Sequence, residues 1–320
     1  MNYNIDKYKG KLDVERQQER TRGLDLGFEE LHKNFTWYLG RPFIVYGYPG
    51  HGKTEVCFEM LIQLSIIHHL KHFIISPETG NGEARDVVRE LITKYGRKHW
   101  KEMSQAEYEN AFNWVREYFY VCDPNSELPK DYTIGQVYDY VDQVERDSTW
   151  MFNTVMIDTW LELNNEGQPV FEQVKSLIKE SRYQDYERRR TTLITVHAKD
   201  DKPLFDKTTH KRWLPIPSPS NMNGGTNWWY LGYSILCVFR PDTDVIPDTA
   251  YNESWLIFQK VKPKEAGKAG MVKWFYDLEK SRFYEKINGH STYGQGSVIN
   301  KEIEPNENID EIWENDSQPF

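Results

Sequence analysis

The sequence predicts an α/β protein whose mainly parallel sheet is flanked by helices, with antiparallel strands added at its C-terminal end. Three observations lead to this fold class. Short apolar strands alternate with helical segments over two thirds of the chain, a glycine-rich segment links one strand to the helix after it, and closely spaced aromatic strands follow residue 225. Alternation of strands and helices is typical of a parallel sheet covered on both faces.

Composition narrows the class of protein further. The 320-residue chain has a net charge of −9, which argues against a general nucleic-acid coat but leaves room for a local basic channel. Its three cysteines form no C-x-x-C pair, its N-terminus is too polar for a signal peptide, and no apolar run approaches the roughly 18 residues of a membrane span. These features predict a cytoplasmic protein without a membrane partner.

The chain divides into three expected segments. Residues 1–22 are charged and have too few apolar side chains to fold alone, so we expect a linker or arm that lies on another surface. Residues 23–297 contain the alternating pattern and form the expected main domain. Residues 298–320 contain seven acidic residues and one lysine, a composition that predicts disorder in isolation.

Periodicity places the elements of the main domain. The expected parallel strands are 43–46, 72–76, 118–123, 154–158 and 192–197. The expected helices are 54–69, a broken stretch at 82–114, one beginning near 133, and 168–187. The late aromatic strands at 233–240, 255–262, 271–277 and 282–286 are expected to be antiparallel.

The segment GYPGHGKT, residues 47–54, matches the phosphate-binding pattern G-x-x-x-x-G-K-[ST], here called the P-loop. An apolar strand precedes it and an amphipathic helix is expected after it, which is the context that the pattern requires. The glycines let backbone N–H groups surround a phosphate at a helix N-terminus. A glycine-rich turn that matches by chance is the alternative. The expected nucleotide-binding residues are Gly47, Pro49, Gly50, His51, Gly52, Lys53 and Thr54.

Polar residues at three other strand ends complete the expected site. Asp158 ends an apolar strand and is expected to bind Mg²⁺ together with the Thr54 hydroxyl. Glu78 follows the strand after the P-loop helix, where a carboxylate can deprotonate an attacking water. His197 ends the next strand beyond Asp158 and can touch the γ-phosphate. The alternatives are a turn aspartate, a solvated loop acid and a loop histidine.

Six segments resemble one family and keep its order over roughly residues 23–286. They are GLDLGFEELHKNF, YGYPGHGKTE, FIISPETG, VMIDTWLELN, ITVHAKD and QKVKPKEAGKAGMVKWFYDLEKSRFYE. The set resembles the RecA-like motor domain of hexameric replicative helicases, the DnaB class, and most of all its Twinkle and phage primase–helicase branch. The P-loop alone is unspecific, whereas the ordered set is fairly specific.

The resemblance implies a RecA-like P-loop NTPase core that hydrolyses ATP with Mg²⁺ at the interfaces of a homo-oligomeric, hexameric ring. It also implies translocation on single-stranded DNA during replication. Within this family pattern, Lys53 and Thr54 match the phosphate and metal ligands and Glu78 the catalytic glutamate. Asp158 matches the Walker B aspartate, and His197 the γ-phosphate sensor.

One position departs from the family pattern. Relatives carry a Lys-x-Arg pair that reaches the neighbouring subunit's ATP, whereas this chain has Lys260, Val261 and Lys262. A lysine supplies charge without the bidentate fork of arginine. Either Lys262 acts as a weaker finger in trans or an arginine such as Arg282 does so. The alternative is that both lysines lie on a solvated strand edge.

Contacts to DNA are expected from the long connection after His197. Lys202, Lys207, Lys211 and Arg212 offer sequence-independent phosphate contacts, interleaved with aromatic side chains. A second candidate is YQDYERRR, residues 183–190. For either segment, a charged surface loop without function is the alternative.

Two other functions share this fold. A RecA- or RadA-like recombination ATPase would form filaments on DNA, and a KaiC-like regulatory ATPase would signal to proteins without DNA. The acidic tail suggests a further partner, such as a primase or another replication protein. Its end, ENDSQPF, resembles the tips of bacterial single-strand-binding proteins, in which Phe320 and its carboxylate would fill an apolar pocket. A merely solubilising tail is the alternative.

Overall fold

Ten strands form one sheet in the part of the chain that this computed structural model describes, namely residues 4–16, 22–79, 83–164, 167–188, 190–199, 202–205, 210–244, 246 and 249–294. In sheet order the strands are β12 (His290–Tyr293), β11 (Arg282–Ile287), β10 (Gly270–Asp277), β9 (Glu253–Lys260), β8 (Ser234–Phe239), β1 (Phe43–Gly47), β5 (Thr191–His197), β4 (Thr154–Ile157), β2 (His72–Ile75) and β3 (Phe119–Val121). The strands from β8 to β3 run parallel, and β9 to β12 continue antiparallel. The predicted fold class is confirmed.

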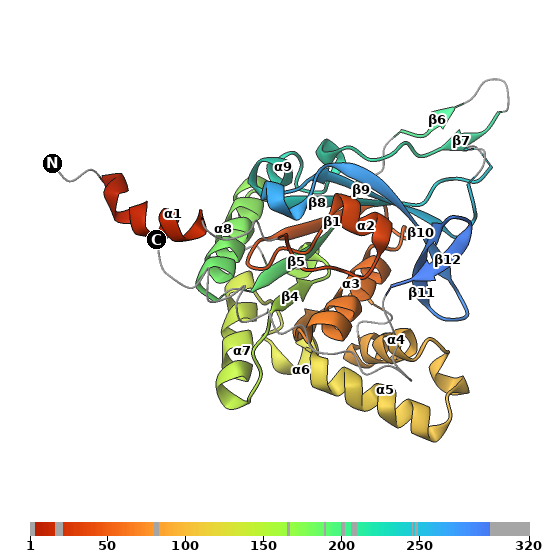
Figure 1. Ribbon diagram of the computed structural model, residues 1–320, viewed down its shortest axis with the longest axis horizontal. Coiled ribbons are helices and arrows are strands. Elements are labelled where there is room, and N and C mark those ends of the chain that lie inside the picture. The colour runs from red at the N-terminus through yellow and green to blue at the C-terminus, as the bar shows by residue number, and fades with distance from the viewer. Residues whose placement is uncertain are drawn as a thin grey trace.

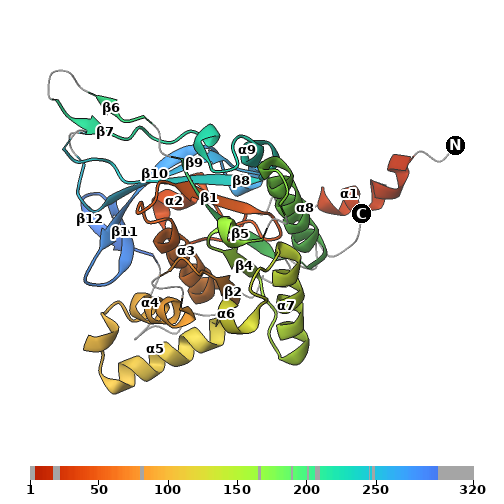
Figure 2. The same ribbon diagram turned by 180° about the vertical axis from the view of Figure 1, so that it is seen from behind.

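Helices cover both faces of this sheet (Figures 1 and 2). The α-helices are α1 (Lys9–Glu15), α2 (Glu29–Asn34), α3 (Lys53–His68), α4 (Ala84–Gly96), α5 (Gln105–Tyr118), α6 (Pro124–Glu127), α7 (Ile134–Asp147), α8 (Val170–Arg188) and α9 (Asn227–Leu231). Short 3-10 turns are η1 (Asn4–Tyr8), η2 (Trp100–Glu102), η3 (Trp160–Glu162), η4 (Pro219–Asn221) and η5 (Lys264–Ala266). The described part contains no helix with the length and apolarity needed to cross a membrane.

One predicted strand direction is wrong. We expected all four late aromatic strands to be antiparallel, but β8 runs parallel to β1 and is antiparallel only to β9. The chain leaves β5, passes through a long connection that includes α9, and re-enters the sheet in the direction of β1. A connection of this length is a crossover, which joins parallel strands, whereas the connections from β9 to β12 are shorter, at residues 261–269, 278–281 and 288–289.

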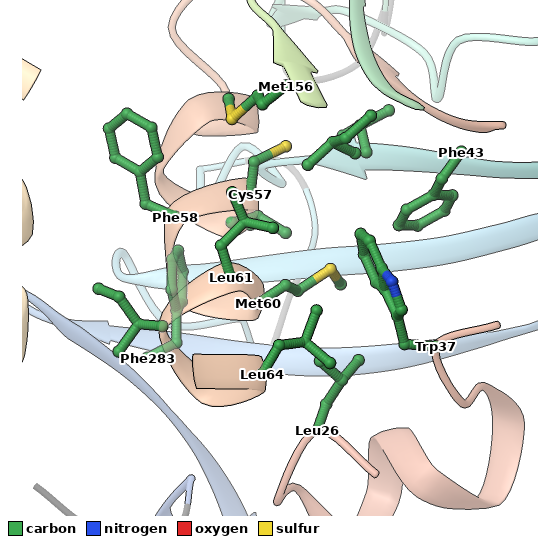
Figure 3. Close-up of a cluster of buried hydrophobic side chains, with 14 of the residues drawn as sticks. Leu26, Trp37, Phe43, Cys57, Phe58, Met60, Leu61, Leu64, Met156 and Phe283 are labelled. Carbon is green, nitrogen blue, oxygen red and sulfur yellow. The ribbon is translucent and has the colours of Figure 1, made fainter. Parts of the chain in front are cut away.

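Two apolar cores form, one on each face of the sheet. On one face α3, α4 and α5 pack against Val45, Ile74 and Leu193, and Figure 3 shows α3 side chains meeting Trp37 and Phe43. On the other face α7, α8 and α9 pack against Ile44 and other residues that alternate with the first set. Alternation along each strand is the pattern of a sheet covered on both faces.

The helix that follows the P-loop differs from our expectation of an amphipathic helix. α3 is buried on almost every side, including the polar residues Glu59, Gln63 and Ser65. It lies between the sheet, the segment before β1, α4 and the late strands (Figure 1). A helix enclosed in this way needs no polar face, although its buried polar groups need partners.

Two segments extend from the body in Figures 1 and 2. One is the arm formed by η1 and α1, whose Ile5 and Leu12 side chains are exposed. The other is a hairpin of β6 (Leu204–Phe205) and β7 (Arg212–Trp213), which the long connection after β5 forms. The predicted acidic tail, residues 298–320, lies outside the described residues.

The buried histidine of β2 predicts a loss of stability in acid. His72 is fully buried, and burial lowers its pKa from 6.5 to about 3. Between these values the unfolded chain binds a proton that the folded chain does not, so stability is lost as the pH falls below 6.5. Between pH 7 and pH 5, we expect the unmodified protein to lose roughly 2 kcal/mol more free energy of unfolding than the His72→Leu variant loses. Urea unfolding at both pH values measures this, with exposed His290→Leu as the control; equal acid losses in the three proteins would refute it.

Candidate active site at the carboxyl edge of the sheet

The carboxyl ends of four neighbouring parallel strands meet at one edge of the sheet. β1 ends at Gly47 and enters the P-loop, and β5 beside it ends at His197. Asp158 directly follows β4, and Glu78 lies shortly after β2. The strand order β1-β5-β4-β2 brings these four positions to the same edge, where open α/β sheets bind ligands.

The P-loop has the backbone that a phosphate cradle requires. Gly50 and Gly52 have φ angles of 74° and 84°, a region that glycine adopts at no steric cost. Gly52 is the N-cap of α3, so the first N–H groups of that helix face the loop. At Gly47 a Cβ atom would lie 2.3 Å from the carbonyl oxygen of Val238, so the backbone of β8 leaves no room for a side chain.

Lys53, His197 and Glu78 form a continuous chain of contacts. The Lys53 Nζ donates to the backbone oxygen of Tyr48 and lies 3.2 Å from Nδ1 of His197. The His197 Nε2 lies 2.9 Å from the Glu78 carboxylate. An ammonium group only donates and a carboxylate only accepts, so the neutral imidazole with its proton on Nε2 satisfies both contacts.

The environment of Lys53 favours an anion. Its side chain is buried, and burial lowers its pKa from the usual value although Glu78 and Asp158 favour its charged form. Among the described residues, no carboxylate oxygen lies within ion-pair distance of its Nζ. A buried cation without a paired anion is costly, and a bound phosphate would relieve that cost.

Asp158 accepts hydrogen bonds from three hydroxyl groups on three different elements. Thr54 of α3 donates at 2.9 Å and Ser76 after β2 donates at 2.7 Å, while Thr195 of β5 donates to the other carboxylate oxygen. The Thr54 hydroxyl and the Asp158 carboxylate therefore place oxygen atoms side by side. This donor set fits Mg²⁺, which prefers carboxylate and hydroxyl oxygens beside substrate phosphates.

His51, which was predicted to bind nucleotide, is held at the β8 side of the P-loop. Its Nδ1 accepts the backbone N–H of Arg240 at 3.0 Å, and its ring lies against Tyr48 and Phe239. Burial lowers the pKa of His51 to about 4, so the ring is neutral near pH 7. His51 could therefore contact a ligand through the face of its neutral ring, but it would not supply a positive charge.

The two late lysines lie toward the opposite edge of the sheet. β9 is antiparallel to β8, and Lys260 pairs with Ile235 near the beginning of β8. The Lys260 Nζ donates to the backbone oxygen of Trp229 at 2.5 Å, and Lys262 is exposed. Among the described residues, neither lysine makes a hydrogen bond or ion pair to the P-loop of its own chain, so a role at the ATP site of a second copy stays a prediction.

Arg282 is excluded as the alternative finger. Its side chain is fully buried, and its guanidinium binds the carboxylate of Glu59 on α3 through both Nε and Nη2. A guanidinium that is held in the interior cannot reach another subunit. The prediction that Arg282 could act in trans was therefore wrong.

The predicted DNA-contacting residues lie mostly on the projecting hairpin. Lys202, Lys211 and Arg212 are exposed, whereas Lys207 lies outside the described residues. The Arg212 guanidinium is 5.6 Å from the centre of the half-exposed Phe205 ring. In the second candidate segment, residues 183–188 belong to α8, and Arg190 is only 1% exposed and paired with Asp142 and Glu145. Arg190 is therefore not a DNA contact.

Sequence reasoning missed the groups that hold the site residues in place. Ser76 and Thr195 bind Asp158, and the backbone of Arg240 binds His51. For Thr195 a signal existed, because it lies two residues before His197 and residues at that spacing share one face of a strand. The Arg240 contact is made by backbone and leaves no signal in the sequence.

The chain has a RecA-like α/β fold with a P-loop between β1 and α3. One similar solved structure, "ATPase Domain of G40P", has a TM-score of 0.66 and 15% identity, over 89% of this chain and 99% of that one. A second, "The Structure Of A DnaB-Like Replicative Helicase And Its Interactions With Primase", has a TM-score of 0.65 and 15% identity, over 88% of this chain and 68% of that one. No protein-family model and no curated protein matches the chain. At this identity the likeness establishes the fold.

Proposed function

We propose that the chain is a Mg²⁺-dependent ATPase that single-stranded DNA stimulates and that acts as a ring-forming helicase motor in replication. The contact chain from Lys53 through His197 to Glu78, beside the Thr54–Asp158 pair, carries this proposal. The fold, which is that of replicative-helicase ATPase domains, supports it.

Each site residue has a defined role in this proposal. Lys53 and the P-loop N–H groups bind the phosphates, and Thr54 and Asp158 would hold Mg²⁺, which supplies charge neutralisation at the phosphate oxygens. The Glu78 side chain is 44% exposed and so accessible to water, and it orients the attacking water and accepts its proton. His197 contacts both Lys53 and Glu78, so it can link phosphate binding to the position of the base.

The opposite placement of the P-loop and the late lysines supports an ATP site between two copies. In a head-to-tail ring each chain would present its P-loop edge to the exposed Lys262 of the next. The projecting arm fits such an assembly, because its Ile5 and Leu12 side chains are exposed on their own chain and a neighbouring copy could cover them. We propose a homo-oligomeric ring, hexameric as in the family that the sequence resembles.

The hairpin supports a single-stranded nucleic acid as the ligand. Its exposed lysine and arginine side chains lie among half-exposed Leu204 and Phe205. Cations bind phosphates and aromatic rings stack on bases, without sequence preference. A primase is a proposed protein partner, since one of the two similar solved structures concerns a DnaB-like replicative helicase and its interactions with primase.

The test is steady-state ATP hydrolysis by purified protein with and without single-stranded DNA. We expect stimulation of about 5- to 150-fold, the usual range of coupling between two sites. Lys53→Ala should lower turnover by about 10²–10³-fold, because it removes the fixed positive charge that stabilises the transferred phosphate in the transition state. The same variant should keep or raise its Tm, since a buried cation without a paired carboxylate is costly to the folded state.

A hairpin variant identifies the DNA contacts. In Lys202→Ala/Lys211→Ala/Arg212→Ala, DNA affinity should fall and its log–log salt dependence should become shallower by about 0.7 per lost phosphate contact. ATP turnover that DNA does not change in the unmodified protein would contradict the motor and favour a regulatory ATPase of the KaiC-like kind. DNA-bound filaments in electron micrographs, in place of closed rings, would favour the recombination ATPase.

A further inference from the structure

The connection that forms the hairpin begins and ends at the nucleotide site. The N–H of Ala198, directly after β5, donates to the backbone oxygen of Gly47 at 2.9 Å. Where the connection returns, the N–H of Asn223 donates to the backbone oxygen of His197 at 2.8 Å. Both ends of the hairpin segment are therefore fixed to residues of the candidate active site.

Two tyrosines hold the returning limb at further points. The hydroxyl of Tyr46 donates to the backbone oxygen of Pro217 at 2.9 Å, and that of Tyr48 donates to the backbone oxygen of Pro215 at 3.1 Å. Both tyrosines are fully buried and flank Gly47. Their spacing of two residues matches the spacing of the two prolines. The two phenols therefore make successive hydrogen bonds between the end of β1 and the segment that contains the prolines.

The limb that they hold is stiff. Pro215 and Pro217 have no N–H and have a fixed φ, so this segment resists bending. Near the Pro217 oxygen, the Cys237 thiol at 4.0 Å is a weak donor, so Tyr46 is the strong one. Burial raises the pKa of Tyr46 well above its usual value, which keeps the phenol protonated.

A second acceptor completes the arrangement at Tyr46. The side-chain oxygen of Gln259, at the end of β9, lies 2.6 Å from the same hydroxyl. A phenol has a single proton, so Pro217 and Gln259 share it. Tyr46 thereby joins the P-loop strand, the base of the hairpin and the strand that leads to Lys260.

We propose that Tyr46 and Tyr48 are positioning residues that couple nucleotide binding at the P-loop to the conformation of the β6–β7 hairpin. A shift of the P-loop moves both phenols, and the stiff proline segment carries that movement to the hairpin. Coupling is reciprocal, so a ligand on the hairpin also changes the P-loop. The identity of that ligand, single-stranded DNA, rests on the proposed function, whereas the coupling itself does not.

Trypsin cleavage after Lys211 and Arg212 tests the coupling without DNA, because both are exposed on the hairpin. In the unmodified protein, a saturating non-hydrolysable ATP analogue with Mg²⁺ should change the cleavage rate by about fivefold or more. The double variant Tyr46→Phe/Tyr48→Phe should lose this difference while it still binds a fluorescent ADP analogue. Mass spectrometry of the fragments measures the rates.

Tyr138→Phe is the matched control, because it removes another buried phenol hydrogen bond, to Thr192 at the far end of β5. It should keep the nucleotide effect. The proposal is overturned if the hairpin of the unmodified protein ignores bound nucleotide, if the double variant keeps the full effect, or if no nucleotide binds.

The DNA assay separates this inference from the proposed function. If DNA stimulates turnover, the double variant should lose about fivefold or more of that stimulation, and its DNA affinity without nucleotide should be unchanged. If nucleotide alters trypsin cleavage but DNA alters nothing, the coupling stands and the DNA motor is refuted. Full DNA stimulation in the double variant would refute the coupling alone.

Discussion

Replacing Glu78 with glutamine is expected to lower ATP turnover by about 10²–10⁴-fold, the usual contribution of a general base. Glutamine keeps the size of the side chain and an oxygen that can accept from the Nε2 of His197, which lies 2.9 Å from the carboxylate. An amide cannot take a proton from water, so nucleotide binding should persist while hydrolysis slows by this factor. Steady-state hydrolysis, together with titration of a fluorescent ADP analogue, separates the two effects.

Glu83 provides the matched control for this substitution. It is an exposed acid in the same connection, next to the start of α4, and it pairs with Arg85 away from His197. Glu83→Gln should keep both binding and turnover. If Glu78→Gln hydrolyses ATP at the normal rate, the base is another group, and the contact chain through His197 has only a structural role.

The sequence was most informative where function depends on neighbouring residues. The P-loop lies within eight residues, and its glycines, lysine and threonine occur together because one strand–loop–helix unit needs all of them. Asp158 and His197 could be placed for a related reason. Parallel strands have their carboxyl ends at one edge, so the last polar residue of each strand indicates the same site.

Contacts between distant segments could not be predicted in this way. Arg282 looked like a free arginine near the end of the main domain, yet it pairs with Glu59, which lies 223 residues earlier. Arg190 belonged to a run of three arginines and proved to be buried against α7. The sequence does not reveal which distant acid a basic residue will pair with in the folded chain. A count of basic residues therefore overestimates how many are free to contact DNA.

The direction of β8 was missed for a similar reason. Its aromatic and apolar residues fit a parallel or an antiparallel neighbour equally well, and only the path of the preceding connection decides. The same connection forms the hairpin and brings Pro215 and Pro217 against the P-loop tyrosines. Sequence periodicity carries no information about that path.

Replacing Arg282 with methionine is expected to lower the free energy of unfolding by about 3–5 kcal/mol, the cost of leaving a buried partner charge alone. Burial by itself would raise the pKa of Glu59, but Arg282 reverses this and lowers it. Without the guanidinium, the carboxylate of Glu59 on α3 stays buried in the protein interior and has lost its main counter-charge. Urea unfolding at pH 7 measures the loss.

The surface pair of Lys280 and Asp277 sets the scale for this result. It joins the end of β10 to the turn before β11 as an ion pair at 3.0 Å whose lysine is 44% exposed, so Lys280→Met should cost less than about 1 kcal/mol. A similar small cost for Arg282→Met would contradict the buried pair.

The double variant Glu59→Met/Arg282→Met shows whether the isolated charge is the cause. Removing both partners leaves no lone charge, so stability should recover in part from the level of Arg282→Met. Recovery should be incomplete, because the Phe283 N–H and the Gln63 amide both donate to Glu59 and would lose their acceptor. ATP turnover per folded molecule should persist in this variant, since Arg282 is structural; its loss from a stable, folded protein would restore Arg282 as a residue of the reaction.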